Sequence, residues 1–219
     1  DAPRLSSAGR SYPVAMTHVP ARRDEAIEHQ TRRAIEQALS THPGDVLVFL
    51  PGQREIARVE AALGLPPPPA MAGGGREGVA LAAGKSTPPQ PSPAFAGEGV
   101  EVLTLHGELP LEQQTRVLQP AADGRRRVVL ATNVAESSVT LPGVRVVIDS
   151  GLAREPRFDP NSGFSRLEVV TISQASADQR AGRAGRVAEG VAYRLWPQSQ
   201  RLEPQRRPEI AQVELAALA

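Results

Sequence analysis

The chain has 219 residues, of which 40% are apolar and 22% are charged, and its formal net charge is +1 at pH 7. This balance excludes a polybasic tail and an acidic disordered chain, and the length suits one domain or two small ones. The absence of Cys excludes disulfide scaffolds, thiolate zinc sites and cysteine nucleophiles. Because no apolar run approaches the roughly 18 residues of a membrane span and no signal peptide is evident, we expect a soluble cytoplasmic protein.

The first predicted elements follow a lead-in that we assign to residues 1–20. Apolar residues spaced three or four apart predict a helix over 24–39. The apolar run Asp45–Leu50 follows the breaker His42-Pro43-Gly44 and predicts a buried strand. Helical spacing returns over Arg54–Leu63, so we expect this strand to be followed by a second helix.

Residues 64–99 contain eight Pro and eight Gly in 36 positions. Such a composition cannot bury enough apolar surface to offset the entropy of ordering the chain, so we interpret the stretch as a disordered insertion. Within it, Gly84-Lys85-Ser86-Thr87 ends like a phosphate-binding loop. That motif requires Gly where Val79 stands, and no apolar strand precedes it, so we do not assign a phosphate loop.

Strand and helix patterns resume after the insertion. Val100–Leu105 predicts a strand, Leu111–Leu118 a helix, and Arg127–Ala131 and Val144–Asp149 two further strands. Residues 154–172 alternate in polarity around a strong Asp-Pro-Asn-Ser-Gly turn signal, which predicts a β-hairpin.

A helix over 174–184 and a strand over 191–196 complete a domain that we assign to residues 21–196. Residues 197–219 are first rich in Pro, Gln and Arg and then helical in pattern, and we interpret them as the start of a following C-terminal helical domain, cut short. Solidly apolar strands separated by helices are typical of a parallel sheet covered on both faces. The sequence therefore predicts an α/β fold with a mostly parallel sheet, helices on both faces, and a hairpin near 154–172.

The sharpest chemical signal is a row of basic and amide side chains near residue 180. Gln179, Arg183 and Arg186 share one face of a helix, whereas Arg180 points about 100° away. Two guanidiniums and an amide without an acidic neighbour on that face suit an anion with several oxygens, such as a triphosphate. The alternative is a solvated arginine face, which the two Gly of this segment disfavour because each weakens a helix by roughly 1 kcal/mol.

A second signal is the polar segment 131–140, which directly follows a buried strand. In open α/β sheets, ligands lie beyond the carboxyl ends of the strands. This segment offers hydroxyls and an amide, which are typical contacts to a sugar-phosphate chain: Thr132, Asn133, Ser137, Ser138 and Thr140. The alternative is a polar loop that caps itself. Glu136 and Asp149 could act as paired acids, but nothing in the sequence fixes them within reach of each other.

Two further strand ends carry weaker signals. Gly52 and Gln53 lie where a helix begins after a strand, and a helix N-terminus offers free N–H groups to a phosphate. His106 and Gly107 end another strand in the same way. Neither pair is specific alone, and His106 can equally be a packing or capping residue.

Taken in order, these segments resemble the motifs of superfamily 2 helicases of the DEAH/RHA class, and most closely those of the bacterial HrpB type. The matching segments are PGQREI, LHGELPLEQQ, ATNVAESSVTLPGV and QRAGRAGR, which resemble motif IV, the turn and helix that follow it, motif V and motif VI. The predicted hairpin resembles the β-hairpin of that class. The resemblance covers about residues 10–64 and 100–218, and it implies the second RecA-like domain of a helicase.

The resemblance also implies roles for particular residues. Arg183 and Arg186 would reach the γ-phosphate of ATP bound on a first RecA-like domain, and Gln179 would help to place the attacking water or the phosphate. Ser138 and Thr140 would face the nucleotide. Single-stranded nucleic acid would be held by residues at three strand ends, namely Thr132, Asn133, Gly52, Gln53, His106 and Gly107.

The phosphate loop and the DEAH acid of such a helicase do not occur in this chain, so the resemblance implies half of a motor. The cofactor would be ATP with Mg²⁺, whose ligands would lie in the first domain, and this chain would hold no metal itself. We expect the chain alone to be inactive, monomeric, free of membranes, and to bind single-stranded RNA, with DNA not excluded. The alternative is a non-catalytic RNA-binding or scaffold module with a RecA-like fold.

Overall fold

The computed structural model describes residues 12–64, 99–121, 124–137, 139–159 and 164–205. Most of the insertion predicted over 64–99 lies outside these ranges, as do Ser138 and the start of a following helical domain expected within 206–219. Within the described ranges, every helix is too short or too polar to cross a lipid bilayer.

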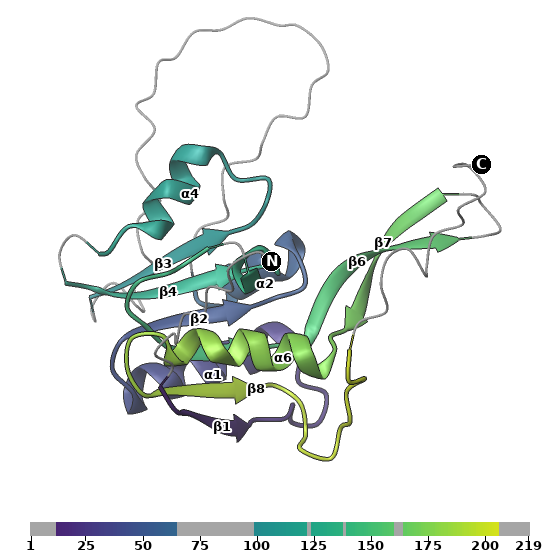
Figure 1. Ribbon diagram of the computed structural model, residues 1–219, viewed down its shortest axis with the longest axis horizontal. Helices are drawn as coiled ribbons and strands as arrows, with labels where there is room; N and C mark the ends of the chain where they lie inside the picture. Colours follow the sequence, from purple (N-terminus) through teal and green to yellow (C-terminus); the bar gives the residue numbers. More distant parts are fainter. Residues whose placement is uncertain (1–11, 65–98, 122–123, 138, 160–163, 206–219) are drawn as a thin grey trace, which may run out of the picture.

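Six parallel strands form one sheet in the order β1-β8-β5-β2-β4-β3 (Figure 1). The strands are β1 (Val14–His18), β2 (Asp45–Phe49), β3 (Val100–Leu105), β4 (Arg126–Ala131), β5 (Val144–Asp149) and β8 (Gly190–Arg194). All five residues of the central strand β2 are buried. The parallel sheet expected from the apolar strand patterns is confirmed.

Helices cover both faces of this sheet, as the sequence predicts. On one face, α1 (Ile27–Thr41) and α2 (Gln53–Ala62) pack on Val46 and Val48 of β2. On the other face, α4 (Leu111–Leu118), the four-residue helix α5 (Val134–Ser137) and α6 (Gln174–Ala181) pack on Leu47 and Phe49. Alternate side chains of one strand therefore build two separate cores, as the pleat of a strand requires.

The predicted hairpin is confirmed as the antiparallel pair β6 (Leu152–Asp159) and β7 (Phe164–Thr171). Figure 1 shows it extending away from the main sheet. The chain that follows β8 lies beside its base: Leu202 packs against the cluster of Ala153, Ile172, Ala177 and Trp196. The N–H of Gln174, the first residue of α6, donates to the carbonyl of Glu203 over 2.7 Å. Residues 202–204 therefore pack beside the base of the hairpin and the first turn of α6.

The structure corrects two parts of the sequence analysis. Residues 14–18, assigned to the lead-in, form edge strand β1 and pair with β8, so the sheet begins before residue 21. The sequence does not predict this strand because its apolar run, Val14-Ala15-Met16, is shorter than the roughly four to eight residues that mark a buried strand. The helix predicted over 174–184 ends at Ala181 and tightens into a 3-10 turn, η1 (Gly182–Gly185).

Candidate functional site

The three predicted nucleic-acid segments lie together at the carboxyl edge of the sheet, because β2, β4 and β3 are neighbours in it. Backbone hydrogen bonds tie their ends: the N–H of Leu50 donates to the carbonyl of Ala131 over 2.8 Å, and that of Thr132 donates to Leu105 over 3.1 Å. The chain leaves each strand within one or two residues of these bonds. The fold thus brings the polar residues after three strands to one edge.

Gln53 and His106 meet directly across this edge. The Gln53 Nε2 atom lies 2.9 Å from Nδ1 of the His106 ring. Burial lowers the pKa of His106, which favours the neutral ring that can accept a hydrogen bond from the amide at this nitrogen. Gly107 is exposed beside them. This contact joins two segments that the sequence analysis could treat only separately.

Gly52 allows a second close approach at the same edge. A Cβ atom at this position would lie 3.2 Å from the side chain of Arg154, which comes from the base of the hairpin. Arg154 also lies 3.8 Å from the carboxylate of Glu55 on α2. No local sequence pattern marks Arg154, since its place beside Gly52 depends on how the hairpin meets the sheet.

Thr132 and Asn133 introduce the short helix α5. The carbonyls of Thr132 and Asn133 accept hydrogen bonds from the N–H groups of Ala135 and Glu136, at 3.2 and 2.9 Å. The Asn133 side chain is exposed, and Ala135 is buried in the core. The two candidate residues are therefore fixed by their backbone while the Asn133 side chain faces solvent.

Gln179, Arg183 and Arg186 all reach the segment 136–140, although η1 replaces the end of the predicted helix. Arg183 donates from Nε to the carbonyl of Glu136 over 3.0 Å and from Nη1 to that of Val139 over 2.5 Å. Arg186 donates to Oγ1 of Thr140 over 3.0 Å, and Gln179 Nε2 lies 3.4 Å from the carbonyl of Glu136. The three residues predicted to bind a triphosphate thus all contact the polar segment that follows β4.

The charge of Arg183 is poorly compensated within the domain. Its residue surface is 5% exposed, and its Nη2 atom is buried without a hydrogen-bond partner among the described residues. Burial, together with the neighbouring Arg186, lowers the pKa of Arg183. Among the described residues, neither arginine forms an ion pair, so both bind only neutral acceptors. Such a pair can exchange these acceptors for the oxygens of an anion.

Arg180 has the opposite surroundings, as its different direction on the helix predicts. It is 1% exposed and lies between two carboxylates, with Glu136 Oε2 at 3.0 Å and Asp149 Oδ1 at 2.9 Å. Burial raises the pKa of Asp149 although the guanidinium opposes this effect. The two acids that the sequence could not bring together therefore meet on one arginine.

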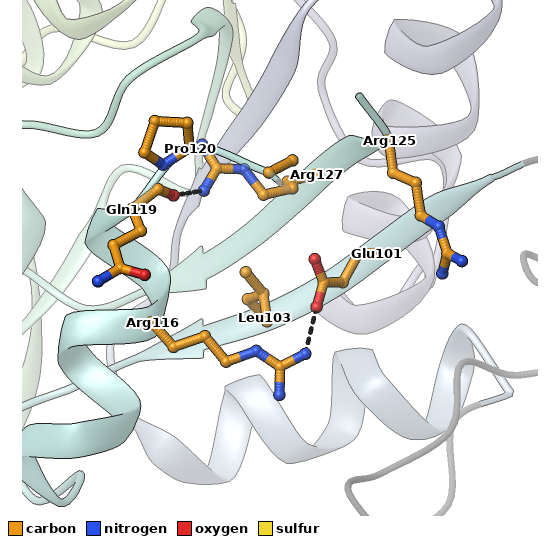
Figure 2. A pocket seen from close by; sticks show the side chains of 8 residues that line it. Glu101, Leu103, Arg116, Gln119, Pro120, Arg125 and Arg127 are labelled. Atoms are coloured by element: carbon orange, nitrogen blue, oxygen red, sulfur yellow. Dashed lines mark hydrogen bonds and ion pairs between the residues drawn. The ribbon is translucent and has the colours of Figure 1, made fainter. Parts of the chain in front are cut away.

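A hollow of about 230 Å³ lies at the opposite, amino-terminal edge of β3 and β4 (Figure 2). Its charged groups are matched within the domain: Arg116 lies 2.6 Å from Glu101, and the buried Arg127 lies 2.7 Å from Asp45. Figure 2 also shows Arg127 directed at the carbonyl of Gln119. None of the predicted site residues lines this hollow.

Comparison with known proteins shows which protein family this chain resembles. The model of the helicase conserved C-terminal domain matches residues 92–188. The chain is 36% identical over 220 residues to the ATP-dependent RNA helicase HrpB of Escherichia coli K12, covering all of this chain and 24% of that protein. It is 34% identical over 210 residues to the pre-mRNA-splicing factor ATP-dependent RNA helicase DEAH10 of Arabidopsis thaliana, covering 95% and 26%.

A solved structure agrees with these sequence matches. The crystal structure of the E. coli DExH-box NTPase HrpB superposes with a TM-score of 0.77 at 35% identity, over 96% of this chain and 23% of that one. The chain therefore spans about a quarter of the length of the proteins it matches.

Proposed function

Because this chain belongs to the DEAH/RHA class of ATP-dependent RNA helicases, as a helicase C-terminal domain with a RecA-like fold, we propose that it is the C-terminal motor half of such an enzyme. In this proposal, a first RecA-like domain of the same full-length protein binds ATP. This chain supplies arginine fingers to that ATP and grips single-stranded nucleic acid. The observation that supports it best is the convergence of Gln179, Arg183 and Arg186 on residues 136–140.

The fingers act by charge. When the two domains close, Arg183 and Arg186 exchange carbonyl and hydroxyl acceptors for oxygens of the γ-phosphate, since charge-assisted hydrogen bonds are about twice as strong as neutral ones. The Nη2 atom of Arg183 already lacks a partner among the described residues. Gln179 helps to place the attacking water or the phosphate, and Ser138 and Thr140 face the nucleotide. Fingers of this kind are worth about 10³–10⁵ in rate.

The grip on nucleic acid lies on the neighbouring part of the same edge. The backbone of single-stranded RNA, with DNA as a second possible strand, is held by Thr132, Asn133, Gly52, Gln53, His106 and Gly107. The sequence contains seven aromatic residues, so a platform of stacked bases is not proposed. Contacts to sugar and phosphate are indifferent to base sequence, and we expect binding that weakens with salt.

The remaining parts of the motor lie outside this chain. ATP is used with Mg²⁺, whose ligands belong to the first domain. The chain alone is expected to hydrolyse no ATP. In the full-length protein it works as a cytoplasmic monomer with its own first domain as partner.

The test uses the full-length protein. Arg183→Ala and Arg186→Ala should each lower RNA-stimulated ATP turnover by about 10³-fold or more, while RNA affinity and thermal stability stay near wild type. Arg32→Ala, a matched arginine deletion at an exposed ion pair on α1, should leave all three unchanged. Unchanged turnover in both finger variants would instead favour the non-catalytic RNA-binding or scaffold module.

A further inference from the structure

Glu136 lies where two parts of the proposed site meet. One is the segment 132–137, which begins with the proposed nucleic-acid contacts, and the other is the segment 176–183, which contains Arg183. Its carboxylate accepts hydrogen bonds from Ser176 Oγ over 2.7 Å and from Arg180 Nε over 3.0 Å. Its main-chain carbonyl accepts from Arg183 Nε over 3.0 Å and lies 3.4 Å from Gln179 Nε2. Four side chains of the segment 176–183 therefore converge on a single residue.

The same residue is connected to the proposed RNA contacts by its own backbone. The Glu136 N–H donates to the carbonyl of Asn133 over 2.9 Å, which closes the first turn of α5. A helix of four residues has no stability of its own, because nucleation is unfavourable and too few hydrogen bonds follow it. The position of α5 is therefore set by tertiary contacts, of which those of Glu136 are polar and directional.

Arg180, which holds the carboxylate of Glu136, is itself fixed by the core of the sheet. Arg180 is 1% exposed, also binds Asp149 Oδ1 over 2.9 Å, and lies 4.8 Å above the ring of Phe49. Asp149 and Phe49 end the two central strands β5 and β2. A displacement of α5 thus cannot carry Arg180 with it, and must change how the Glu136 carbonyl meets Arg183.

We propose that Glu136 is a positioning residue that couples nucleic-acid binding to the placement of Arg183. RNA contacts at Thr132 and Asn133 shift the position of α5. The Glu136 carbonyl moves with α5, and this movement makes the position of the Arg183 guanidinium more or less favourable for its action on ATP. Glu136 itself touches neither ligand. The inference rests on the proposed function, since it assumes that Arg183 acts on ATP and that Thr132 and Asn133 contact RNA.

The experiment measures coupling rather than activity alone. In the full-length protein, the dissociation constant of a single-stranded RNA is measured with and without a non-hydrolysable ATP analogue, and the ratio of the two values is the coupling factor. Such factors are typically about 5–150-fold. Glu136→Ala should reduce the wild-type factor to about 1, while RNA affinity without nucleotide changes little. Its thermal stability should fall, because Arg180 then keeps Asp149 as its remaining ionic partner. Glu136→Gln keeps the size and a hydrogen-bond acceptor and should retain part of the coupling.

Controls separate this proposal from a structural role and from the proposed function. Ser176→Ala removes one donor to the carboxylate but leaves the Arg180 contact, and it should keep most of the coupling. If Glu136→Ala is too unstable to measure, Glu136→Gln decides: a factor equal to that of the wild type overturns the proposal. Loss of coupling in Ser176→Ala as complete as in Glu136→Ala would also overturn it, because any disturbance of α6 would then suffice. Failure of the proposed function appears differently, as normal ATP turnover in Arg183→Ala.

Discussion

Two buried arginines at opposite edges of the sheet have nearly the same exposure and different surroundings. Arg127 is 2% exposed, lies 2.7 Å from the carboxylate of Asp45, and donates to the carbonyls of Gln119 and Pro142 as well. Arg183 is 5% exposed, binds two neutral carbonyls, and leaves Nη2 without a partner among the described residues. Burial alone therefore does not distinguish these two arginines. They differ in their partners, because Arg127 has an opposite charge beside it and Arg183 has neutral carbonyls.

The first prediction tests this difference with one substitution at both positions. Arg127→Met should lower the free energy of unfolding by about 3–5 kcal/mol, because it leaves the buried carboxylate of Asp45 without its cation. Arg183→Met should change it by less than about 1 kcal/mol, since it removes a buried charge that has no opposite charge beside it. Urea denaturation of the 219-residue chain measures both values.

Arg180 provides an internal control for the same experiment. Arg180→Met strands two carboxylates, Glu136 and Asp149, and should resemble Arg127→Met rather than Arg183→Met. Equal losses at Arg127, Arg180 and Arg183 would mean that all three are structural, and the contrast between the two edges would disappear.

The part of the fold set by local patterns could be predicted from the sequence. The strands Val100–Leu105 and Val144–Asp149 and the helix Leu111–Leu118 begin and end at the predicted residues, because apolar runs and helical spacing there are bounded by Gly and Pro. Strand β1 was missed because it is short, half exposed and defined by its pairing with β8. No local signal distinguishes such an edge strand from a loop.

The candidate site divides in the same way. Residue types and spacing were enough to select Gln179, Arg183 and Arg186 and to set Arg180 apart, but their roles on ATP stay a prediction. The contact of Gln53 with His106 depends on the order β2-β4-β3, which no local pattern contains. The meeting of Glu136 and Asp149 on Arg180 likewise needs α6 to pack beside both α5 and the end of β5.

A second prediction compares Gly182 and Gly185, the two glycines that alternate with the arginines of the segment 180–186. A Cβ atom at Gly185 would lie 2.5 Å from the carbonyl oxygen of Tyr12 and 2.8 Å from the side chain of Val14, whereas one at Gly182 would meet nothing within 4 Å. Gly185→Ala should therefore cost about 1–3 kcal/mol of stability, as overpacking does. Gly182 has the right-handed helical φ of −57°, so Gly182→Ala should be neutral or stabilise by up to about 1 kcal/mol.

Thermal and urea denaturation measure the stability of the two alanine variants. The same variants in the full-length protein test whether another domain approaches Gly182, because the open space there matters only in that case. Gly182→Ala should then keep stability and lose ATP turnover. A Gly185→Ala variant as stable as wild type would show that β1 can shift away from η1 at no cost.

The smallest expected effect concerns pH and compares the buried carboxylate of Asp149 with that of Glu25, which lies beside Arg33 near the surface. Burial raises the pKa of Asp149, so the folded chain holds this proton more tightly than the unfolded chain does. Ionisation then costs stability, and the advantage of wild type over Asp149→Asn should shrink as pH rises from about 4. Arg33 lowers the pKa of Glu25 to about 2, so the opposite holds there. The advantage of wild type over Glu25→Gln should be complete above about pH 5 and disappear as pH falls toward 2.

The Glu25 pair lies near solvent, with 12% of the Glu25 side chain and 24% of the Arg33 side chain exposed, and its effect should not exceed about 1 kcal/mol. Urea titrations of wild type and both variants at several pH values between 3 and 7 give the two slopes. They should have opposite signs. Parallel slopes would mean that Arg180 stabilises the ionised carboxylate of Asp149 as fully as Arg33 stabilises that of Glu25. Arg180 and Asp149 would then behave as a simple ion pair.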